Sequence, residues 1–565
     1  MRCCSAVLCL GNNSMPEQTP VRMSALWAAY GDALGFITEL ASKSILRRRV
    51  DETPVQSLVP WVRRIGGRFG TNVPLPQGCY SDDTQLRLAT CRAIRGDGVF
   101  DVEAFAKVEL PVWRSYALGA GRGTKTAARA LATPSVQWCA NFHRMRGVNY
   151  VDGGGNGAAM RIQPHVWCTS DREDNSSLLL AVIQNAVTTH GHPRGIVGAA
   201  FHALCLRLAL WAQKVPGPAE WQDVAQELAV IPGILRSDEQ LGSFWVPTWE
   251  TATKQSLDIA FENTVQEVLR DVDLAREAAT QDRGGSIASR YEKLLRASGC
   301  MDRASVGSGT KTAVAASYLA YVAGGEPTEA LQACVNLLGS DTDSIGTMAG
   351  ALLGAACKYD PPEAVADKEY IEKEALRLQA ITGRRTCTSF AYPDLLYWRA
   401  PERELDCLGL KGKQWILSGL GEVYPVGEPV AERSDGTSWQ WFKLPHNQQV
   451  LLKRRAKPQD LEREALPAAF SSSQDTRSDK VQHKKESRSS VACPGHLFDD
   501  PAERAAGPLS LDEATDRAIR SHFAPEVIGR LLLRLSEEEN GMELAIAFAA
   551  VVAKAKRARA RRGTS

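Results

Sequence analysis

Two short stretches of the 565-residue sequence combine acidic and hydroxyl side chains at the start of an apolar pattern. Residues 81–84 are Ser-Asp-Asp-Thr, and residues 340–344 are Ser-Asp-Thr-Asp-Ser. Ser, Thr and Asp are favoured N-caps, and carboxylates near a helix N-terminus complement its dipole, so helix capping explains either stretch by itself. A cap needs only one side chain, however, and each stretch has two carboxylates. Their mutual repulsion is costly without a cation, and oxygen ligands of this kind suit Mg²⁺, Mn²⁺ or Ca²⁺.

The helix predicted after the second stretch is rich in small residues. They would let another helix approach closely: Gly346, Ala349, Gly350, Ala351, Gly354 and Ala355. Such an approach would help to bring both acidic stretches into one cleft. Together they could hold two ions about 4 Å apart, as hydrolases often do.

A third feature is the segment 31–39, Gly-Asp-Ala-Leu-Gly-Phe-Ile-Thr-Glu. Its Gly and Ala spacing suits helix packing, which by itself is a sufficient explanation. Asp32 does not fit that explanation, because a carboxylate among small apolar residues requires a partner. Glu39 lies just past the predicted helix and is a candidate to activate a water molecule.

Two further segments suggest ligand contacts. Residues 153–161 begin with three glycines, which would free the backbone to present N–H groups to an anion such as pyrophosphate, and a following helix would strengthen this. A plain Gly-rich turn explains the segment equally well. Residues 189–193, Thr-His-Gly-His-Pro, contain a histidine pair that is either a helix cap or a ring that stacks on a ligand.

Helices are the elements expected to position these side chains. Apolar residues recur with helical period, and Gly, Pro, Asn and Asp clusters separate the segments. The clearest helical segments are 24–33, 84–94, 178–188, 196–212, 256–279, 311–322, 328–338 and 344–356. An all-α domain over residues 23–398 follows, after a flexible N-terminal segment at residues 1–22.

The sequence changes character after residue 398. A small β-rich appendage is expected at residues 399–468, with β-prone segments and a turn between the first two of them. The segments are 414–417, 439–443 and 449–453, and the turn is 434–437. Residues 469–500 are polar and are predicted to form a disordered linker. Residues 501–565 are predicted to be helical, with helix starts near 509 and 541 and a basic tail at 554–562.

Composition narrows the classes of partner and the cellular compartment that are expected. A formal net charge of +2 gives no indication of a general nucleic-acid partner, although the basic tail leaves room for one. The fourteen cysteines show no CxxC pair and no zinc spacing, which indicates a reducing compartment and a cytoplasmic protein. The N-terminus is only weakly like a signal peptide, and Met1, Met15 or Met23 could be the start. No apolar stretch reaches the about 20 residues of a membrane span, so no membrane partner is expected.

Taken in order, these motifs resemble the ADP-ribosylglycohydrolase family, which includes dinitrogenase-reductase-activating and ADP-ribosylarginine-hydrolase types. The resemblance extends over roughly residues 23–395. The matching pieces are 31–39, 81–84, 119–124, 155–161, 189–193 and 340–344. Six short motifs in the right order make a chance match improbable. The fold that the resemblance implies is all-α, with two Mg²⁺ ions, or Mn²⁺, in a cleft.

The resemblance also implies roles for individual residues. Glu39 matches the catalytic glutamate of some members, whereas in others a metal-bound aspartate, here Asp83, does that work. His190 matches the histidine near the ribose. The implied ligands are Ser81, Asp82 and Asp83 for one ion and Asp341, Asp343 and Ser344 for the other, with Asp343 bridging. The implied phosphate-binding loop is Gly155, Asn156 and Gly157.

The expected function is hydrolysis of the bond between ADP-ribose and an acceptor, with protein arginine as the expected acceptor. The alternatives are an ADP-ribose-binding module without turnover and a hydrolase of serine-linked or nucleic-acid-linked ADP-ribose. The complete carboxylate set favours the enzyme. Ser340 and Ser344 replace the usual Gly and Thr, but the hydroxyl ligand is retained. Residues 213–305, which include Phe-Trp-Val-Pro-Thr-Trp at 244–249, could reshape the acceptor side of the cleft.

Overall fold

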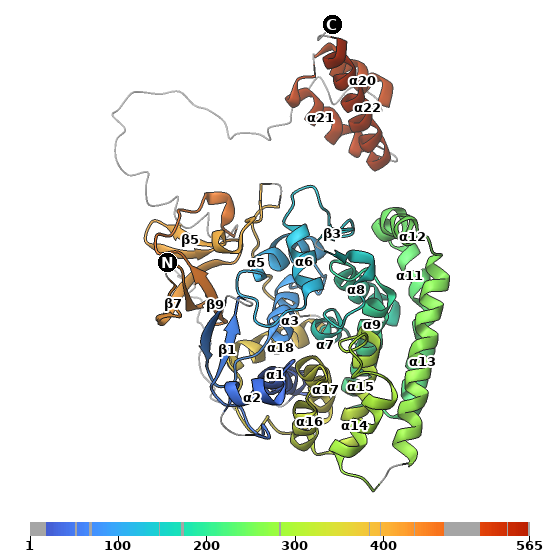
Figure 1. The fold of residues 1–565 in the computed structure, drawn as a ribbon. Helices are drawn as coiled ribbons and strands as arrows, with labels where there is room; N and C mark the ends of the chain where they lie inside the picture. The colour runs from blue at the N-terminus through green and yellow to red at the C-terminus, as the bar shows by residue number, and fades with distance from the viewer. Residues whose placement is uncertain are drawn as a thin grey trace, which may run out of the picture. The chain divides into compact units, whose positions relative to one another are not determined.

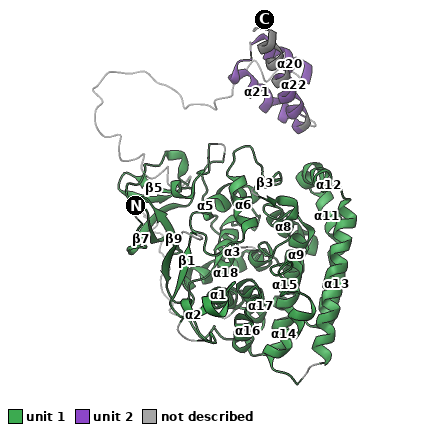
Figure 2. Cartoon of the chain, viewed as in Figure 1, with its two compact units in different colours: residues 1–479 green, residues 480–565 purple. Residues whose placement is uncertain are grey.

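The computed structural model divides the chain into two units, residues 1–479 and residues 480–565 (Figure 2). The structure describes residues 19–50, 53–66, 70–145, 147–170, 174–281, 284–383, 385–395, 397–433, 436–467, 509–521, 523–538 and 541–562. The linker predicted at 469–500 lies outside these residues. The first unit joins the predicted helical domain and the predicted β-rich appendage.

Two helices, α1 (Pro20–Thr38) and α17 (Thr342–Ala356), form the centre of the first unit, and nearly all of their residues are buried. Around them lie α3 (Asp82–Ala93), α9 (Pro193–Ala212), α15 (Gly309–Val322), α16 (Pro327–Asn336) and α18 (Lys368–Thr382) (Figure 1). The first helix begins at Pro20, inside the segment expected to be flexible. The eight predicted helical segments are all helices, with small differences at their ends.

The remaining helical elements of the first unit lie outside this centre, and the long helix α13 runs along one side of it (Figure 1). The helices are α2 (Lys43–Arg49), α4 (Val102–Ala104), α5 (Leu110–Trp113), α6 (Arg122–Leu131), α7 (Gln163–Trp167), α8 (Asn175–Val187), α10 (Pro218–Glu227), α11 (Ile231–Ser237), α12 (Val246–Thr253), α13 (Leu257–Gln281) and α14 (Ile287–Ala297). The short 3₁₀ or π segments are η2 (Phe105–Glu109), η3 (Tyr150–Asp152), η4 (Ala159–Arg161), η5 (Leu228–Val230), η6 (Leu241–Trp245), η7 (Glu404–Asp406) and η8 (Arg463–Ala465).

Glycines allow α1 and α17 to pack backbone against backbone. A Cβ atom on Gly31 would lie 2.1 Å from the carbonyl oxygen of Gly346, and one on Gly350 would lie 2.2 Å from that of Trp27. A Cβ atom on Gly35 would lie 2.4 Å from the carbonyl oxygen of Thr342. The small residues noted in the sequence therefore form the contact between these helices, and the end of α1 lies at the start of α17.

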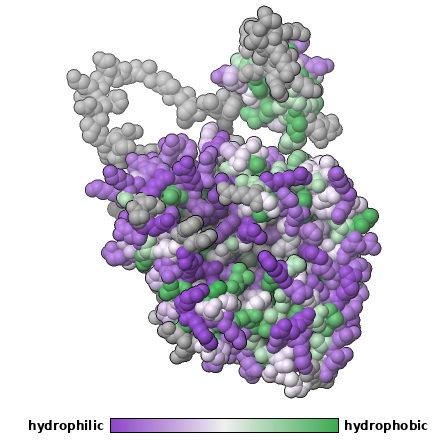
Figure 3. Space-filling model, in the orientation of Figure 1, coloured by the Kyte–Doolittle hydropathy of each residue, from purple (hydrophilic) through white to green (hydrophobic). Residues whose placement is uncertain are grey.

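Among the described residues, one helix would suit a membrane span by length and composition. This helix, α9, has a mean hydropathy of 1.6 over its most apolar stretch, but 72% of that stretch is buried. It contacts α8, α15 and α17 and is a central helix of the first unit. On the face seen in Figure 3, hydrophilic residues predominate on the first unit, with hydrophobic residues in scattered patches.

In the part of the chain that the structure describes, strands occur in three places. Two small hairpins that the sequence analysis did not predict are β1 (Trp61–Ile65) with β2 (Thr71–Leu75), and β3 (Arg144–Met145) with β4 (Val148–Asn149). The predicted appendage is an antiparallel sheet in the order β5-β6-β7-β8-β9. Its strands are β5 (Leu408–Lys411), β6 (Gln414–Leu417), β7 (Gly421–Val430), β8 (Ser438–Lys443) and β9 (Gln449–Arg454).

Three of these five strands match the predicted segments, and β5 and β7 were missed. The sequence of β7 contains two prolines and two glycines, which weaken any strand signal. The predicted turn at 434–437 accordingly follows β7 rather than β6, and residues 434 and 435 lie outside the described part of the chain.

The second unit contains α20 (Leu511–Arg520), α21 (Pro525–Ser536) and α22 (Gly541–Arg562). The predicted helix starts near 509 and 541 correspond to α20 and α22, and α21 lies between them. The buried residues of this unit form a core of their own: Leu509, Ala514, Ala518, Phe523, Leu531, Leu535, Phe548 and Val552.

The contact between α1 and α17 predicts a specific sensitivity to added methyl groups. We expect Gly350→Ala to lower the free energy of unfolding by about 1–3 kcal/mol, because the new Cβ atom meets the backbone of α1. Thermal unfolding of the purified protein would show this as a lower midpoint. The matched control is Gly233→Ala on α11, where an added Cβ atom meets nothing within 4 Å. The control should be neutral or slightly stabilising, and equal midpoints for the two variants would contradict the close packing.

Candidate active site

The first acidic stretch lies at the start of α3, where Asp32 of α1 holds it. Ser81 is the N-cap, and its hydroxyl accepts a hydrogen bond from the backbone N–H of Asp83 (3.1 Å). Asp32 accepts hydrogen bonds from the backbone N–H groups of Ser81 (3.0 Å) and Thr84 (2.8 Å) and from the Thr84 hydroxyl (2.5 Å). This is the partner that the Asp32 carboxylate required. Because Asp32 and Ser81 accept from the first N–H groups of α3, the side chains of Asp82 and Asp83 are not needed as helix caps.

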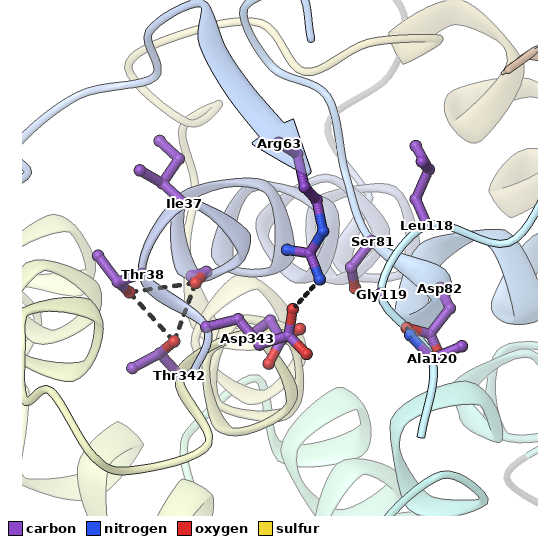
Figure 4. A network of polar contacts seen from close by, with 12 residues as sticks. Ile37, Thr38, Arg63, Ser81, Asp82, Leu118, Gly119, Ala120, Thr342 and Asp343 are labelled. Carbon is purple, nitrogen blue, oxygen red and sulfur yellow. Dashed lines mark hydrogen bonds and ion pairs between the residues drawn. The ribbon is translucent and has the colours of Figure 1, made fainter. Parts of the chain in front are cut away.

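The segment 118–120 holds Asp82. The backbone N–H of Asp82 donates to the carbonyl oxygen of Leu118 (2.7 Å), and one carboxyl oxygen of Asp82 accepts from the N–H of Ala120 (2.5 Å) (Figure 4). Gly119 and Ala120 both have positive φ, which turns this N–H towards the carboxyl. Burial raises the pKa of Asp82 to about 7, and the Glu39 carboxyl adds to the shift.

Asp83 is buried, and one of its carboxyl oxygens has no hydrogen-bond partner. Burial raises its pKa well above the usual range, and the nearby carboxyls of Asp32, Asp82 and Asp341 raise it further. A buried, unpartnered carboxyl oxygen among other carboxyls is unfavourable unless a cation neutralises it. This oxygen is one observation that fits a divalent cation.

The second acidic stretch lies at the start of α17 and faces the first. Asp341 is the N-cap residue of α17, and its carboxyl accepts a hydrogen bond from the side-chain amide of Asn156 (2.9 Å). Asp343 accepts from the N–H of Ser344 (3.0 Å). Burial raises the pKa of Asp343 well above the usual range, and the carboxyls of Glu39, Asp83 and Asp341 contribute. The structure therefore brings the two stretches and Glu39 together.

Within the described residues, no group of three or more His, Cys, Asp or Glu side chains converges closely enough to hold a metal ion. The carboxyls of Asp82 and Asp341 instead bond to donors of the protein, Ala120 and Asn156. Their chemistry fits a hard divalent cation, since several buried carboxyls share one region. The assignment of each ligand stays a prediction.

Two arginines hold the end of α1 where Glu39 lies. The Arg63 guanidinium donates to the Glu39 carboxyl (2.8 Å) and lies over the ring of Phe36, 4.3 Å from its centre. In Figure 4 Arg63 reaches from β1 towards the region of Asp343. Arg49 donates to the backbone carbonyls of Ile37 (2.8 Å) and Glu39 (2.9 Å). The sequence analysis missed Arg63 because it missed the β1–β2 hairpin, whose first strand, Trp-Val-Arg-Arg-Ile, lacks the alternation of apolar and polar residues that marks a strand.

The Gly-rich segment has a different structure from the one expected. The N–H groups of Gly153 and Gly154 donate to carbonyl oxygens of residues 150–152. The N–H of Asn156 donates to the carbonyl oxygen of Gly307 (2.9 Å). These three amides are therefore bonded within the protein, and a phosphate contact of Gly155, Asn156 and Gly157 stays a prediction. The segment continues into η4 and the five-residue helix α7 instead of a long helix. The Asn156 side chain, predicted to contact phosphate, reaches Asp341.

The two histidines have different surroundings. His192 is the N-cap of α9 and accepts from the N–H of Arg194 (3.1 Å), so the capping alternative holds for it. His190 is buried, shares a hydrogen bond with the Thr189 hydroxyl (2.7 Å) and lies against Gly157. Burial lowers the pKa of His190 to about 3, so its ring is neutral at physiological pH. It could therefore contact a ligand as a neutral donor or acceptor.

Residues 213–305, which were expected to reshape the acceptor side of the cleft, contact the segments around Tyr150 and Gly191. Trp245 donates to the Tyr150 hydroxyl (2.8 Å), and Trp249 donates to the carbonyl oxygen of Gly191 (2.6 Å). The Tyr150 hydroxyl in turn donates to the carbonyl oxygen of Val187 (2.6 Å). These tryptophans fix the segments that carry Gly157 and His190. An effect of residues 213–305 on the acceptor stays a prediction.

Comparison with known proteins gives matches to a family model and to solved structures. A family model described as ADP-ribosylglycohydrolase matches residues 20–385. A solved structure titled "ADP-ribosylglycohydrolase-related protein complex" is similar at 20% sequence identity, with a TM-score of 0.37, and the match covers 65% of this chain and 98% of that chain. None of the curated proteins matches the chain.

The three hydrogen bonds to Asp32 predict that it cannot be replaced by its amide. Both carboxyl oxygens accept, so Asp32→Asn must turn its NH₂ group towards a backbone N–H, and we expect unfolding to require about 1–3 kcal/mol less. Urea unfolding would measure this. The control is Asp174→Asn at the exposed N-cap of α8, where Asn caps equally well. Equal losses in the two variants would contradict the role given to Asp32.

Proposed function

The chain belongs to the ADP-ribosylglycohydrolase family and is a glycosidic-bond hydrolase, and on this premise we propose that it releases ADP-ribose from protein arginine with the help of Mg²⁺. The family implies ADP-ribosylated substrates and ADP-ribose as the ligand. The arginine acceptor is proposed by analogy with the ADP-ribosylarginine-hydrolase type. The observation that carries the proposal is the excess of buried carboxyls at the starts of α3 and α17.

Six side chains are proposed to hold two divalent ions. They are Ser81, Asp82, Asp83, Asp341, Asp343 and Ser344. The support is chemical: these groups offer oxygen ligands, the Asp83 carboxyl retains an unpartnered oxygen, and neighbouring carboxyls raise the pKa of both Asp83 and Asp343. Ions bound there would supply Lewis acidity to the ribose hydroxyls and neutralise the carboxylates.

Glu39 is proposed as the general base. Its side chain keeps 13% of its surface exposed, whereas Asp83 is buried, so a water molecule reaches Glu39 more readily. Arg63 fixes the orientation of the Glu39 carboxylate and stabilises its charge. Asp83 is the alternative base.

We propose the following reaction from these roles. Glu39 takes a proton from a water molecule, whose oxygen bonds to the anomeric carbon of the ribose as the bond to the acceptor nitrogen breaks. The leaving nitrogen keeps the electron pair of that bond and receives the proton that Glu39 took from the water molecule. His190, as a neutral ring, is proposed to hydrogen-bond the ribose, and residues 155–157 are proposed to line the ribose and pyrophosphate.

A reducing compartment, and thus the cytoplasm, remains our proposal for the location. The ten cysteines within the described ranges form no disulfide, which supports it.

The metal proposal predicts a loss of turnover on removal of either the ions or their ligands. We expect Asp83→Asn, Asp341→Asn and chelation by EDTA each to abolish release of ADP-ribose from an ADP-ribosylated arginine peptide, measured by chromatography. Glu292→Gln, a change at an exposed position of α14, should leave the rate unchanged. Full activity in EDTA would refute the metal-dependent account. A parallel panel with serine-linked and nucleic-acid-linked ADP-ribose identifies the acceptor. Release from none of them, together with measurable ADP-ribose affinity, would favour the binding module.

The base assignment has its own test. Glu39→Gln keeps the size and the contact with Arg63 but cannot accept the proton, so we expect kcat to fall by about 10²–10⁴-fold with little change in ADP-ribose affinity. Single-turnover kinetics and calorimetry measure the two quantities. Retention of full activity would make Glu39 a structural residue and Asp83 the better candidate.

A further inference from the structure

The five-stranded sheet lies outside the residues that match the family and is nevertheless part of the first unit. The family match ends at residue 385, and the strands run from Leu408 to Arg454. Leu417, Phe442 and Leu452 are buried in the same hydrophobic core as the helices. The sheet therefore packs against the helical domain itself. Two of its polar contacts lead to the ends of α3, one directly through Arg92 and one through Asp367, which also binds Tyr80.

The first of these contacts is at the N-terminal end of α3. Tyr80 directly precedes Ser81, and its buried hydroxyl donates to the Asp367 carboxyl (2.6 Å). The same carboxyl accepts from the backbone N–H of Gln449 in β9 (3.0 Å). Asp367 has a φ of +58°, an unfavourable conformation for a residue other than Gly that its two donors help to hold. One carboxylate thus links the sheet to the residue next to the acidic stretch.

The second contact is at the C-terminal end of α3. The guanidinium of Arg92 makes two hydrogen bonds to the Glu109 carboxyl, at 2.7 and 2.8 Å, and donates a third to the side-chain oxygen of Gln448 (2.7 Å). The Tyr392 hydroxyl also donates to Glu109 (2.7 Å). Arg92, Glu109 and Gln448 are buried. Two residues beyond the family match, Tyr392 and Gln448, therefore complete a buried ion pair of the helical domain.

These two contacts hold both ends of a helix whose twelve residues are all buried. A fully buried helix transmits a displacement of its ends to its first turn, because its neighbours leave little room for local adjustment. The first turn of α3 carries Asp82 and Asp83. The sheet would then hold the carboxyls of Asp82 and Asp83 in place through α3, in addition to Asp32.

We propose that the sheet at residues 408–454 is a positioning element of the active site, acting through Tyr80, Asp367, Arg92 and Gln448 on the carboxyls of Asp82 and Asp83. This inference rests on the proposed function, which assigns those carboxyls to the divalent ions. Tyr80, Asp367 and Gln448 are positioning residues, since none of them is proposed to touch the substrate. Outer groups of this kind orient the groups that bind a metal, and their loss typically weakens metal affinity by about 10–100-fold.

The test uses the full chain with Tyr80→Phe, which removes one hydroxyl, and Gln448→Met, which removes one of the acceptors of Arg92. Mn²⁺ affinity by calorimetry, kcat and KM, and amide hydrogen exchange of residues 82–93 are measured for each. We expect about tenfold weaker Mn²⁺ binding, a lower kcat at similar KM, and faster exchange in α3. The control is Tyr30→Phe in α1, which removes a buried hydroxyl that has no hydrogen-bond partner.

The outcomes separate a positioning role from a stabilising one. Both variants could lower the midpoint of thermal unfolding, but only a positioning role changes Mn²⁺ affinity and α3 exchange beyond the values for Tyr30→Phe. Unchanged exchange and Mn²⁺ affinity in both variants would overturn the inference. A wild-type protein that binds Mn²⁺ but releases no ADP-ribose would refute the proposed function, while the exchange and affinity data would still decide the role of the sheet.

Discussion

The backbone contact between α1 and α17 determines where every acidic group of the site can lie. Because Gly35 packs against Thr342, the end of α1 with Glu39 meets the start of α17 with Asp343. Three residues before Gly35, Asp32 binds the start of α3 and so fixes Asp82 and Asp83 beside the same point. Side chains larger than hydrogen at the glycines would separate the helices and with them these carboxyls. The small residues of two helices are therefore a requirement of the site as well as of the fold.

Electrostatics explains why this arrangement suits a cation. Two carboxylates about 4 Å apart repel each other by about 4 kcal/mol at an effective dielectric constant near 20. A hydrogen bond to a charged group recovers about 1.5–3 kcal/mol, and Asp82, Asp341 and Asp343 each receive at least one. The Asp83 carboxyl also has an unpartnered oxygen. Hydrogen bonds thus offset only part of the repulsion, which is why burial and neighbouring charges together raise the pKa of these groups.

The sequence was informative where function depends on local spacing. The helices, both acidic stretches and Glu39 are recognisable because each is defined within a few residues. Arg63 and Asp367 were not recognisable as parts of the structure around the site, because their partners are distant in the sequence. Glu39 lies 24 residues from Arg63, and Gln449 lies 82 residues from Asp367. The hydrogen-bond partner of Asn156 in the Gly-rich segment was not recognisable for the same reason. The glycines of this segment suggest free amides, but the N–H of Asn156 donates to the carbonyl oxygen of Gly307, a partner that only the folded chain supplies.

The two regions beyond residue 400 differ in the hydrophobic core to which their buried residues belong. The helices of the second unit have a core of their own, with Phe548 and Leu535 buried among residues of that unit. The sheet shares its core with the helical domain and supplies Gln448 to a buried arginine. A chain that ends near residue 400 would lose the Gln448 acceptor of Arg92 and expose the apolar surface that the sheet covers. Such a truncation cannot distinguish substrate recruitment from stabilisation, because it disturbs the helix that carries the acidic side chains. Single substitutions at the contacts of α3 can distinguish them, since they leave the shared core intact.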